Sequence, residues 1–386
     1  MPLRAKRFGR SWRLACLLPA VLAGGCVHRT ADPQVYEAAC PGLTKGVSAE
    51  EAATGIFIVT TRMLDCRGTR PPLLSTGRRS EPAFAVGVAP RAGRWPGAVH
   101  LTGQQDWENA LGVRLRASGG RLLLFVHGYN NTPAQVFDRT AAIVARTGFA
   151  GPAVAFTWPS RGDTLHYTWD EENVAWTRKR LRDFVSALVK RQPHVRMVLV
   201  SHSMGNRAAL DLAATLPETD GARIEQMILA SPDVDRELFA EELELVAKRV
   251  PRITVYASFH DLALKTSWNV HGAPRAGDPS CRYDLWRRNH RKAPQPEIGL
   301  RTCYPVLPDG VDLVDTSGVS SGIGHADFVE SDIAAEDLCR TLAQPPIVNP
   351  ARRAVTLPDG GRRRIFYLDR RPVPDVCATG ATARRR

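Results

Sequence analysis

Beyond residue 30 the sequence lacks an uninterrupted apolar run long enough to cross a bilayer as a helix, so we expect a water-soluble body. It also lacks C-x-x-C pairs, so neither a zinc site nor a thioredoxin-like motif is expected. Its basic runs have neither the aromatic interleaving nor the motifs of nucleic-acid-binding proteins, and no nucleic-acid partner is predicted. The 386 residues, 44% hydrophobic and 24% charged, suffice for one large α/β domain or two small ones.

The first 25 residues have the form of an export signal. Five basic residues and no acidic one precede Leu14, and the apolar stretch from Leu14 to Gly25 is too short to span a bilayer. Small residues then lead into Cys26, which resembles the acylated cysteine of the bacterial lipobox, with Leu22 one place further from it than usual. We predict a lipoprotein signal peptide over residues 1–25 and a lipid anchor at Cys26, on the periplasm-facing membrane surface. The alternative is a secreted protein cut near Gly25.

Six cysteines remain in the body after the leader and Cys26. An even number in an exported protein predicts disulfides. Pairing of nearest neighbours is our hypothesis, because each bond would tie a loop or a tail to itself: Cys40 with Cys66, Cys281 with Cys303, and Cys339 with Cys377.

The net charge of +13 is partly due to the leader, and without its five basic residues the charge is +8. Much of the remainder lies in arginine-rich edges such as Arg287-Arg288, 362–364 and 384–386. We interpret these edges as a solvated basic surface close to anionic lipid.

Strands and helices alternate regularly from about residue 121. Residues 26–50 are predicted to be a linker, 55–61 a first strand, and the Pro-, Gly- and Arg-rich 67–97 loops with short strands. Further strands are predicted at 122–126, 153–157, 195–200, 224–230 and 253–258, and helices at 132–147, 170–191, 204–216 and 236–249. This alternation predicts a mostly parallel sheet with helices on both faces.

The alternation ends after Asp261. Residues 267–309 contain clustered Pro, Gly and Arg without a period, which is typical of a lid, a binding loop or an insertion. A strand at 311–314 and a helix at 331–342 then complete a domain that we place at 51–345. Residues 346–386 are predicted to be a C-terminal extension with a hairpin over 354–368.

The segment Ser201-His202-Ser203-Met204-Gly205 joins a buried strand directly to a helix. It has the form of the G-x-S-x-G nucleophile elbow, with Ser201 in place of the first glycine. Small residues are needed there because the serine lies in a strained turn, and the helix start directs N–H groups toward an oxyanion. Ser203 is therefore the predicted nucleophile, whereas the alternative interpretation is a serine-rich turn.

An oxyanion hole needs two converging backbone N–H donors. One is expected from Met204, the residue after the nucleophile. The other is expected from Tyr129, in the loop that follows the strand ending at Val126. His127 could be a base, but it precedes the nucleophile, and we interpret it as a structural side chain that braces the loop.

The predicted acid is Asp261. In hydrolases with such an elbow the triad follows the order Ser, acid, His. Asp233 follows the first strand after Ser203 and Asp261 the second, which is the usual acid position. Asp233 and Asp235 are alternatively explained as caps of the helix that begins near Arg236.

The predicted base is His325. Three histidines come late enough in the chain, but only His325 follows the final strand, in a glycine-rich loop that can fold back over the sheet. His271 and His290 lie in the irregular segment, where solvated side chains are expected. His202 and His260 adjoin these residues and are expected to point elsewhere.

Five runs resemble a bacterial α/β-hydrolase family of unknown function, associated with esterase or lipase activity: F-V-H-G-Y-N-N, F-T-W-P-S-R-G, S-H-S-M-G-N, I-L-A-S-P-D-V-D and V-Y-A-S-x-x-D. The resemblance covers roughly residues 55–330 and implies the α/β-hydrolase fold. It also implies Ser203, Asp261 and His325 as the triad, but it supplies no substrate.

These expectations together predict a serine esterase that forms an acyl-enzyme. The expected substrate is a small-molecule or lipid ester, and no metal or organic cofactor is implied. A non-catalytic envelope lipoprotein of the same fold is one alternative, and an acyltransferase that uses the same triad is another.

Overall fold

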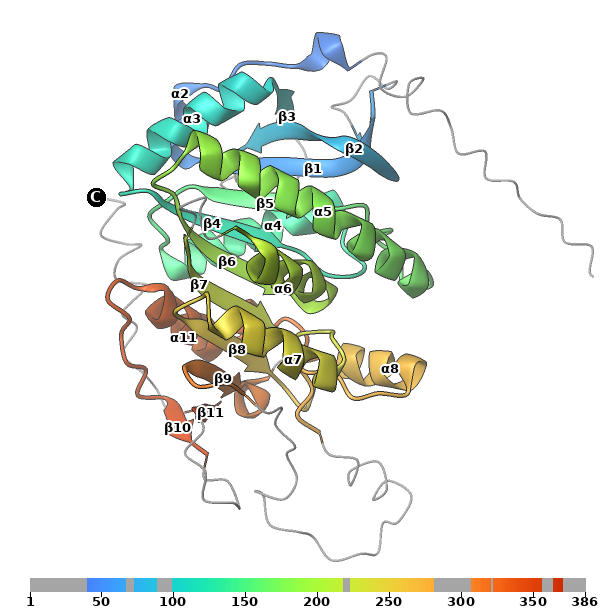
Figure 1. The fold of residues 1–386 in the computed structure, drawn as a ribbon, viewed down its shortest axis with the longest axis vertical. Coiled ribbons are helices and arrows are strands. Elements are labelled where there is room, and N and C mark those ends of the chain that lie inside the picture. The colour runs from blue at the N-terminus through green and yellow to red at the C-terminus, as the bar shows by residue number, and fades with distance from the viewer. Residues whose placement is uncertain are drawn as a thin grey trace, which may run out of the picture. The chain divides into compact units, whose positions relative to one another are not determined.

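The computed structural model describes residues 40–66, 73–88, 99–217, 223–280, 307–320, 322–355 and 364–370. All of them belong to the second of two compact units, Pro33–Arg386. The described residues form one 11-stranded sheet with helices on both faces (Figure 1).

The strands are β1 (Ile56–Asp65), β2 (Leu73–Gly87), β3 (Val99–Thr102), β4 (Arg121–Val126), β5 (Ala153–Thr157), β6 (Arg196–His202), β7 (Arg223–Ala230), β8 (Ile253–Ala257), β9 (Val311–Asp315), β10 (Arg352–Ala354) and β11 (Ile365–Leu368). The helices are α2 (Ala49–Thr54), α3 (Gln104–Ala117), α4 (Pro133–Thr147), α5 (Tyr167–Arg191), α6 (Asn206–Thr215), α7 (Arg236–Ala247), α8 (Leu262–His271), α10 (Asp327–Glu330) and α11 (Asp332–Leu342). Short 3₁₀ helices are η1 (Pro41–Leu43), η2 (Ser203–Gly205) and η5 (Ser317–Val319).

The sheet has the strand order β10-β11-β9-β8-β7-β6-β4-β5-β1-β2-β3. Neighbours from β11 through β1 are parallel, whereas β1–β2, β2–β3 and β10–β11 are antiparallel. The predicted fold, a mostly parallel sheet, is therefore confirmed. The carboxyl ends of the parallel strands share one edge of the sheet, where sites in this fold class form.

Alternate residues of β4 pack into two separate cores. Leu122, Leu124 and Val126 join the apolar residues of α3, α5, α6 and α7 on one face. Leu123 and Phe125 join those of α4 and α11 on the other face. Because both faces are covered, the strands are apolar throughout, which explains why their sequence signal was clear.

The N-terminal region is more regular than the sequence suggested. The prediction of loops with short strands over 67–97 is wrong for β2, a single 15-residue strand between β1 and β3. Pro82 and Gly77 obscured its pattern, and both lie where the pairing of β2 with β1 shifts register. Helix α3 was not predicted, although Trp107, Leu111 and Leu115 recur at four-residue intervals and are buried.

The segment expected to be irregular from residue 267 begins as a helix. α8 extends to His271 and ends at Gly272, whose φ of 69° closes the helix in the left-handed region. Residues 275–280 are buried and return to the sheet edge, where Gly277 N–H donates to Pro232 O. Residues 281–306, including His290, lie outside the described part.

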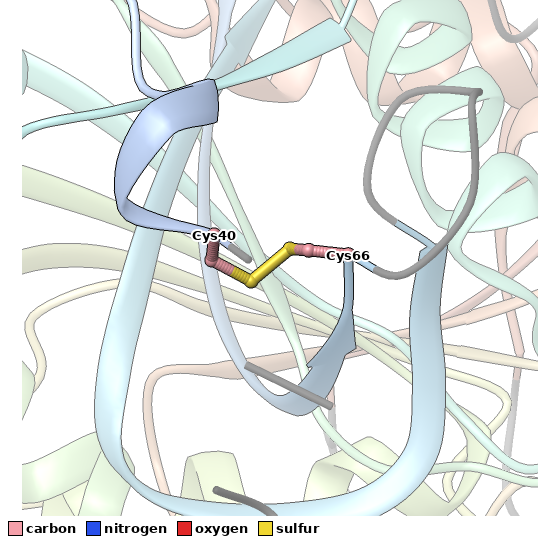
Figure 2. Close-up of a disulfide and its surroundings, with 2 residues drawn as sticks. All are labelled: Cys40 and Cys66. Atoms are coloured by element: carbon pink, nitrogen blue, oxygen red, sulfur yellow. A yellow bond between two sulfur atoms is a disulfide. The ribbon is translucent and has the colours of Figure 1, made fainter. Parts of the chain in front are cut away.

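Both flanks of the domain contribute to this fold. Cys40 and Cys66 form a disulfide, as the first pairing predicted (Figure 2). β10 and β11 form the predicted hairpin, and β11 pairs with β9, so the C-terminal extension adds strands to the sheet. Cys26 and the predicted disulfides Cys281–Cys303 and Cys339–Cys377 involve residues outside the described ranges.

Among the helices of the described residues, none combines the length and the apolar character that a membrane-spanning helix needs.

Candidate active site

Ser203 lies in a sharp turn between β6 and α6. Its φ of 54° falls in the left-handed region, where a non-glycine residue is strained, as expected at a nucleophile elbow. A Cβ on Gly205 would lie 2.3 Å from His127 O, and one on Gly128 would lie 2.5 Å from Ser203 Cβ. The close approach of these backbones explains why small residues occur at this turn.

Asn206 and Ser201 fix the conformation of the turn. Asn206 Nδ2 donates to Ser203 O at 2.8 Å and to Ala230 O at 3.1 Å. Ser201 Oγ, which replaces a glycine of the motif, donates to Asn206 Oδ1 at 2.7 Å. The departure from G-x-S-x-G thus adds a hydrogen bond beneath Ser203.

Asp261 and His325 lie in direct contact. His325 Nδ1 is 2.7 Å from Asp261 Oδ2, and the Asp261 side chain is fully buried. Asp261 Oδ1 accepts the Leu264 N–H at 2.9 Å and so caps α8. The carboxylate is therefore held by a helix start while its second oxygen faces the imidazole.

His202 contacts the backbone and the ring of His325. Because a carbonyl can only accept, His202 Nε2–H donates to His325 O, at 2.8 Å, and the two ring centroids are 4.7 Å apart. Burial and the neighbouring His325 lower the pKa of His202 well below 6.5, so the ring is neutral. The sequence expectation that His202 points elsewhere missed this contact, for which no sequence pattern gives a signal.

The pKa of His325 reflects two opposing effects. Burial alone would lower the pKa, but the charge of Asp261 and its hydrogen bond outweigh burial and raise the pKa above 6.5. An imidazole with this pKa can accept a proton near neutral pH and release it again.

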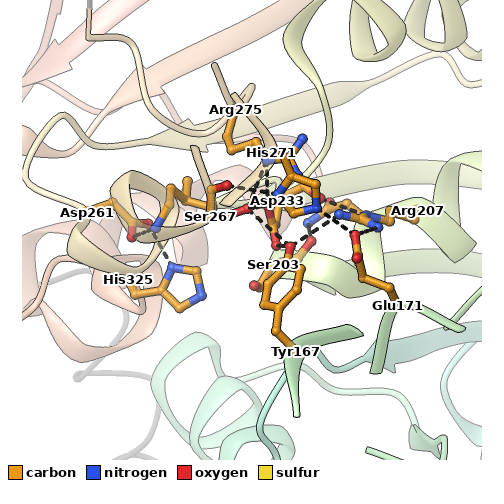
Figure 3. A network of polar contacts seen from close by, with 12 residues as sticks. Tyr167, Glu171, Ser203, Arg207, Asp233, Asp261, Ser267, His271, Arg275 and His325 are labelled. Atoms are coloured by element: carbon orange, nitrogen blue, oxygen red, sulfur yellow. Dashed lines mark hydrogen bonds and ion pairs between the residues drawn. The ribbon is translucent and has the colours of Figure 1, made fainter. Parts of the chain in front are cut away.

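Asp233 lies on the other side of the Ser203 turn, within a polar network (Figure 3). Its carboxylate accepts from Tyr167 Oη at 2.5 Å and Ser267 Oγ at 2.6 Å, and it forms a buried ion pair with Arg275 at 3.1 Å. The cap suggested for Asp233 is wrong, because Asp235 alone accepts the N–H groups at the start of α7.

His271 contacts Glu171 rather than either candidate acid. Its Nε2 lies 2.8 Å from Glu171 Oε1, and its Nδ1 lies 2.8 Å from Ser267 O. Within the described ranges no cluster of His, Cys, Asp and Glu could hold a metal ion.

His127 braces the loop after β4, as expected. Its ring stacks on Trp158 at 4.7 Å and its Nε2 accepts the Trp158 N–H at 3.0 Å. Nδ1 lies 2.8 Å from Gly128 O. Burial lowers the pKa of His127 well below 6.5, which suits a neutral structural side chain. The close approach of Gly128 to Ser203 places the following residue, Tyr129, beside the Ser203 turn.

Comparison with known proteins agrees with this fold. The family described as "Alpha/beta hydrolase of unknown function (DUF900)" matches residues 104–340, more than half of the chain. No curated protein matches significantly.

Solved structures are similar at low identity. An uncharacterized protein from Bacillus cereus ATCC 10987 is 12% identical with a TM-score of 0.29, over 45% of this chain and 59% of that one, less than two thirds of its length. An esterase/lipase from an uncultured bacterium is 12% identical (TM-score 0.25; 55% and 76% covered), and an esterase from Pyrobaculum calidifontis is 12% identical (TM-score 0.31; 70% and 83% covered).

Proposed function

The chain belongs to a family of α/β hydrolases of unknown function, and we propose that it is a serine hydrolase that cleaves carboxylic esters. The observation that carries this proposal is the 2.7 Å contact between His325 and the fully buried Asp261, at the same sheet edge as the strained Ser203. A buried carboxylate on Nδ1 leaves Nε2 free of the proton, as a general base requires.

In the proposed mechanism Ser203 Oγ attacks the ester carbonyl carbon while His325 Nε2 takes the hydroxyl proton. The carbonyl oxygen becomes an oxyanion, which the N–H groups of Tyr129 and Met204 stabilise. Collapse expels the alcohol, which receives the proton from His325, and leaves an acyl-enzyme. Water, deprotonated by His325, then releases the acid and restores Ser203.

Two alternatives share this geometry. An acyltransferase would form the same acyl-enzyme and pass the acyl group to an alcohol other than water. A non-catalytic envelope lipoprotein would bind a ligand without forming it. The paired Asp261 and His325 favour an enzyme, because a binding module has no need of a buried carboxylate that orients an imidazole.

A fluorophosphonate probe tests the proposal. Wild type is expected to be labelled at Ser203, and Ser203→Ala to be folded but unlabelled. A panel of esters with graded acyl chains, with and without an added acceptor alcohol, then separates hydrolysis from acyl transfer. A folded wild type that is not labelled, or is labelled elsewhere, would leave the binding protein as the better account.

The location of the protein is part of the same proposal. An exported chain anchored by acylation of Cys26 would hold the hydrolase at the periplasm-facing membrane surface, close to lipid esters. The leader sequence and the Cys40–Cys66 disulfide, which suits an oxidising compartment, support this location.

A further inference from the structure

The loop Gly128–Asn131, called here the oxyanion loop, has an unusual conformation that must be maintained. Asn130 has a φ of 55°, in the left-handed region. The Asn131 side chain turns back, and its Nδ2 donates to Tyr129 O at 2.6 Å and to Gly128 O at 3.3 Å. This loop contains the Tyr129 N–H and contacts Ser203 through Gly128.

Asp170, in the first turn of α5, holds the loop from one side. It is fully buried, and its carboxylate accepts from Asn130 N–H at 3.0 Å, Ser160 Oγ at 2.6 Å and Arg161 N–H at 2.8 Å. Burial raises the pKa of Asp170, although the three donors favour the ionised form. The contacts are all to the oxyanion loop or to the loop after β5.

Arg62, on β1, holds the same two loops from another side. It is 1% exposed, and its guanidinium donates to Thr157 Oγ1 at 2.9 Å, Ser160 O at 2.7 Å and Asn131 O at 2.8 Å. Burial lowers the pKa of Arg62 to about 9, which shows how unfavourable its position is for a charge. The planar fork reaches acceptors in three directions, which an aliphatic side chain could not do.

Ser160 joins the two charged residues. Its carbonyl accepts from Arg62, and its hydroxyl donates to Asp170 and accepts the Asn131 N–H at 3.0 Å. The Asn131 peptide is thereby held at its N–H by Ser160 and at its carbonyl by Arg62. Arg62 lies outside residues 104–340, so this support comes from a strand that the family match does not include.

We propose that Arg62 and Asp170 are positioning residues that fix the oxyanion loop, and with it the Tyr129 N–H. The inference rests on the proposed function. A buried opposite-charge arrangement with most of its hydrogen bonds directed at two loops stabilises their shape more than it stabilises the core. Its effect is therefore expected on the transition state, where the oxyanion forms, rather than on substrate binding.

The expected decrease in kcat can be estimated from known effects of losing or displacing an oxyanion donor. Removal of one oxyanion donor lowers kcat by about 10²–10³-fold, and a displacement of about 1 Å can have an effect of about 10²-fold. For Asp170→Asn we expect kcat to fall by about 10–100-fold with KM nearly unchanged. Arg62→Lys keeps the charge but not the planar guanidinium, and Ser160→Ala removes only the hydroxyl that links Asp170 to Asn131. The kcat of each of these variants is expected to lie between that of Asp170→Asn and that of wild type.

Each variant is assayed as the full chain. Active sites are counted by fluorophosphonate titration, so that kcat is calculated per active site and misfolded protein does not lower it. A trifluoromethyl ketone that forms a tetrahedral adduct on Ser203 measures oxyanion stabilisation directly. Its affinity is expected to fall in proportion to kcat/KM across the three variants. Ser160→Ala keeps the test informative if the charge substitutions fail to fold.

A second buried charge pair provides the matched control. Arg352, on β10 at the other end of the strand order, contacts the fully buried Asp337 at 2.7 Å. Arg352→Lys and Asp337→Asn are expected to lower Tm but to leave kcat and ketone affinity per active site unchanged.

Two results separate this inference from the proposed function. If wild type is neither labelled nor active on esters, the proposed function fails. If wild type is active and the three variants lose Tm but keep kcat and ketone affinity per titrated site, the pair is merely structural and the inference is overturned. A loss of kcat equal to that of the Arg352→Lys control would overturn it as well.

Discussion

Replacing Asp261 with asparagine removes one charge and little else. Asparagine caps helices about as well as aspartate, so its oxygen can keep the Leu264 N–H and preserve the start of α8. Its NH₂ group then faces His325 Nδ1, which must accept rather than donate. The ring proton moves to Nε2, the nitrogen that has to receive the Ser203 proton.

The loss can be given a magnitude. In triads of this kind the wrong tautomer lowers turnover by about 10⁴-fold, which corresponds to about 5.5 kcal/mol of activation free energy. The free energy of unfolding is expected to change much less, because the cap remains. A large loss of rate with a small loss of stability is the signature of the triad acid.

Asp233→Asn is the matched substitution. Its carboxylate oxygens are directed at Tyr167, Ser267 and Arg275. Neutralising it leaves the Arg275 guanidinium buried with its charge unmatched, and breaking such a pair costs about 3–5 kcal/mol of stability. Turnover is expected to change by only a few-fold. The expected pattern is therefore the reverse of that for Asp261→Asn.

The pH dependence provides a further check. His325 must be neutral to act as base, so kcat/KM of wild type is expected to fall with decreasing pH through its raised pKa, above 6.5. The Asp261 charge raises that pKa, so the acid limb of Asp261→Asn should move to lower pH. Asp233 contributes less to the same pKa, and Asp233→Asn should move the limb only slightly in that direction.

The assay measures kcat/KM on a soluble ester from pH 5 to 9 and Tm by circular dichroism, with active sites titrated by fluorophosphonate. Turnover lost in Asp233→Asn but kept in Asp261→Asn would assign the acid to Asp233. Equal losses of stability in both, with turnover per active site unchanged, would show that neither carboxylate has a catalytic role.

Three further predictions concern the turn, the disulfide and the anchor. Gly205→Ala places a Cβ 2.3 Å from His127 O, a clash that should cost about 1–3 kcal/mol and most of the fluorophosphonate labelling; retention of full labelling would contradict the close approach. Replacing Cys40 and Cys66 together by alanine should lower stability by about 3 kcal/mol, and dithiothreitol should lower the Tm of wild type by more than the Tm of this variant. Metabolic labelling with a palmitate analogue should tag wild type but not Cys26→Ser, and a wild type that is never tagged would exclude the lipid anchor.

The alternation and the turn could be predicted because each depends on local pattern. Strands buried on both faces, such as β4, are apolar without interruption, and the Ser203 turn requires small residues at fixed offsets. The order of strands was enough to rank Asp261 above Asp233, since each strand adds to the parallel sheet in turn. The contact of Asp261 with His325 agrees with that ranking.

What could not be predicted depends on contacts between distant segments. Asp261 was not expected to cap a helix, so the helix α8 was not predicted and its last residues, 267–271, were assigned to an irregular segment. β2 was missed because its pairing with β1 includes register shifts around Arg62, and its Gly and Pro hide any alternation. His202 gave no signal because its partner is a backbone carbonyl from the other end of the domain.

The contrast between local pattern and distant contacts explains why the residues that we propose to support the active site are harder to recognise than the candidate active-site residues themselves. Ser203, Asp261 and His325 follow the ends of β6, β8 and β9, and their order in the chain reflects their position along the sheet edge. Arg62 has no such position, because β1 precedes the alternating region and lies beyond β5 in the sheet. A buried arginine in a strand normally argues against the strand. Here it is explained by acceptors that the strand does not adjoin in sequence: Thr157 at the end of β5 and the carbonyls of Ser160 and Asn131 in two loops. In this chain, the arginine on β1 and the aspartate at the start of the helix after β5 are the two features from which we infer a supported oxyanion loop.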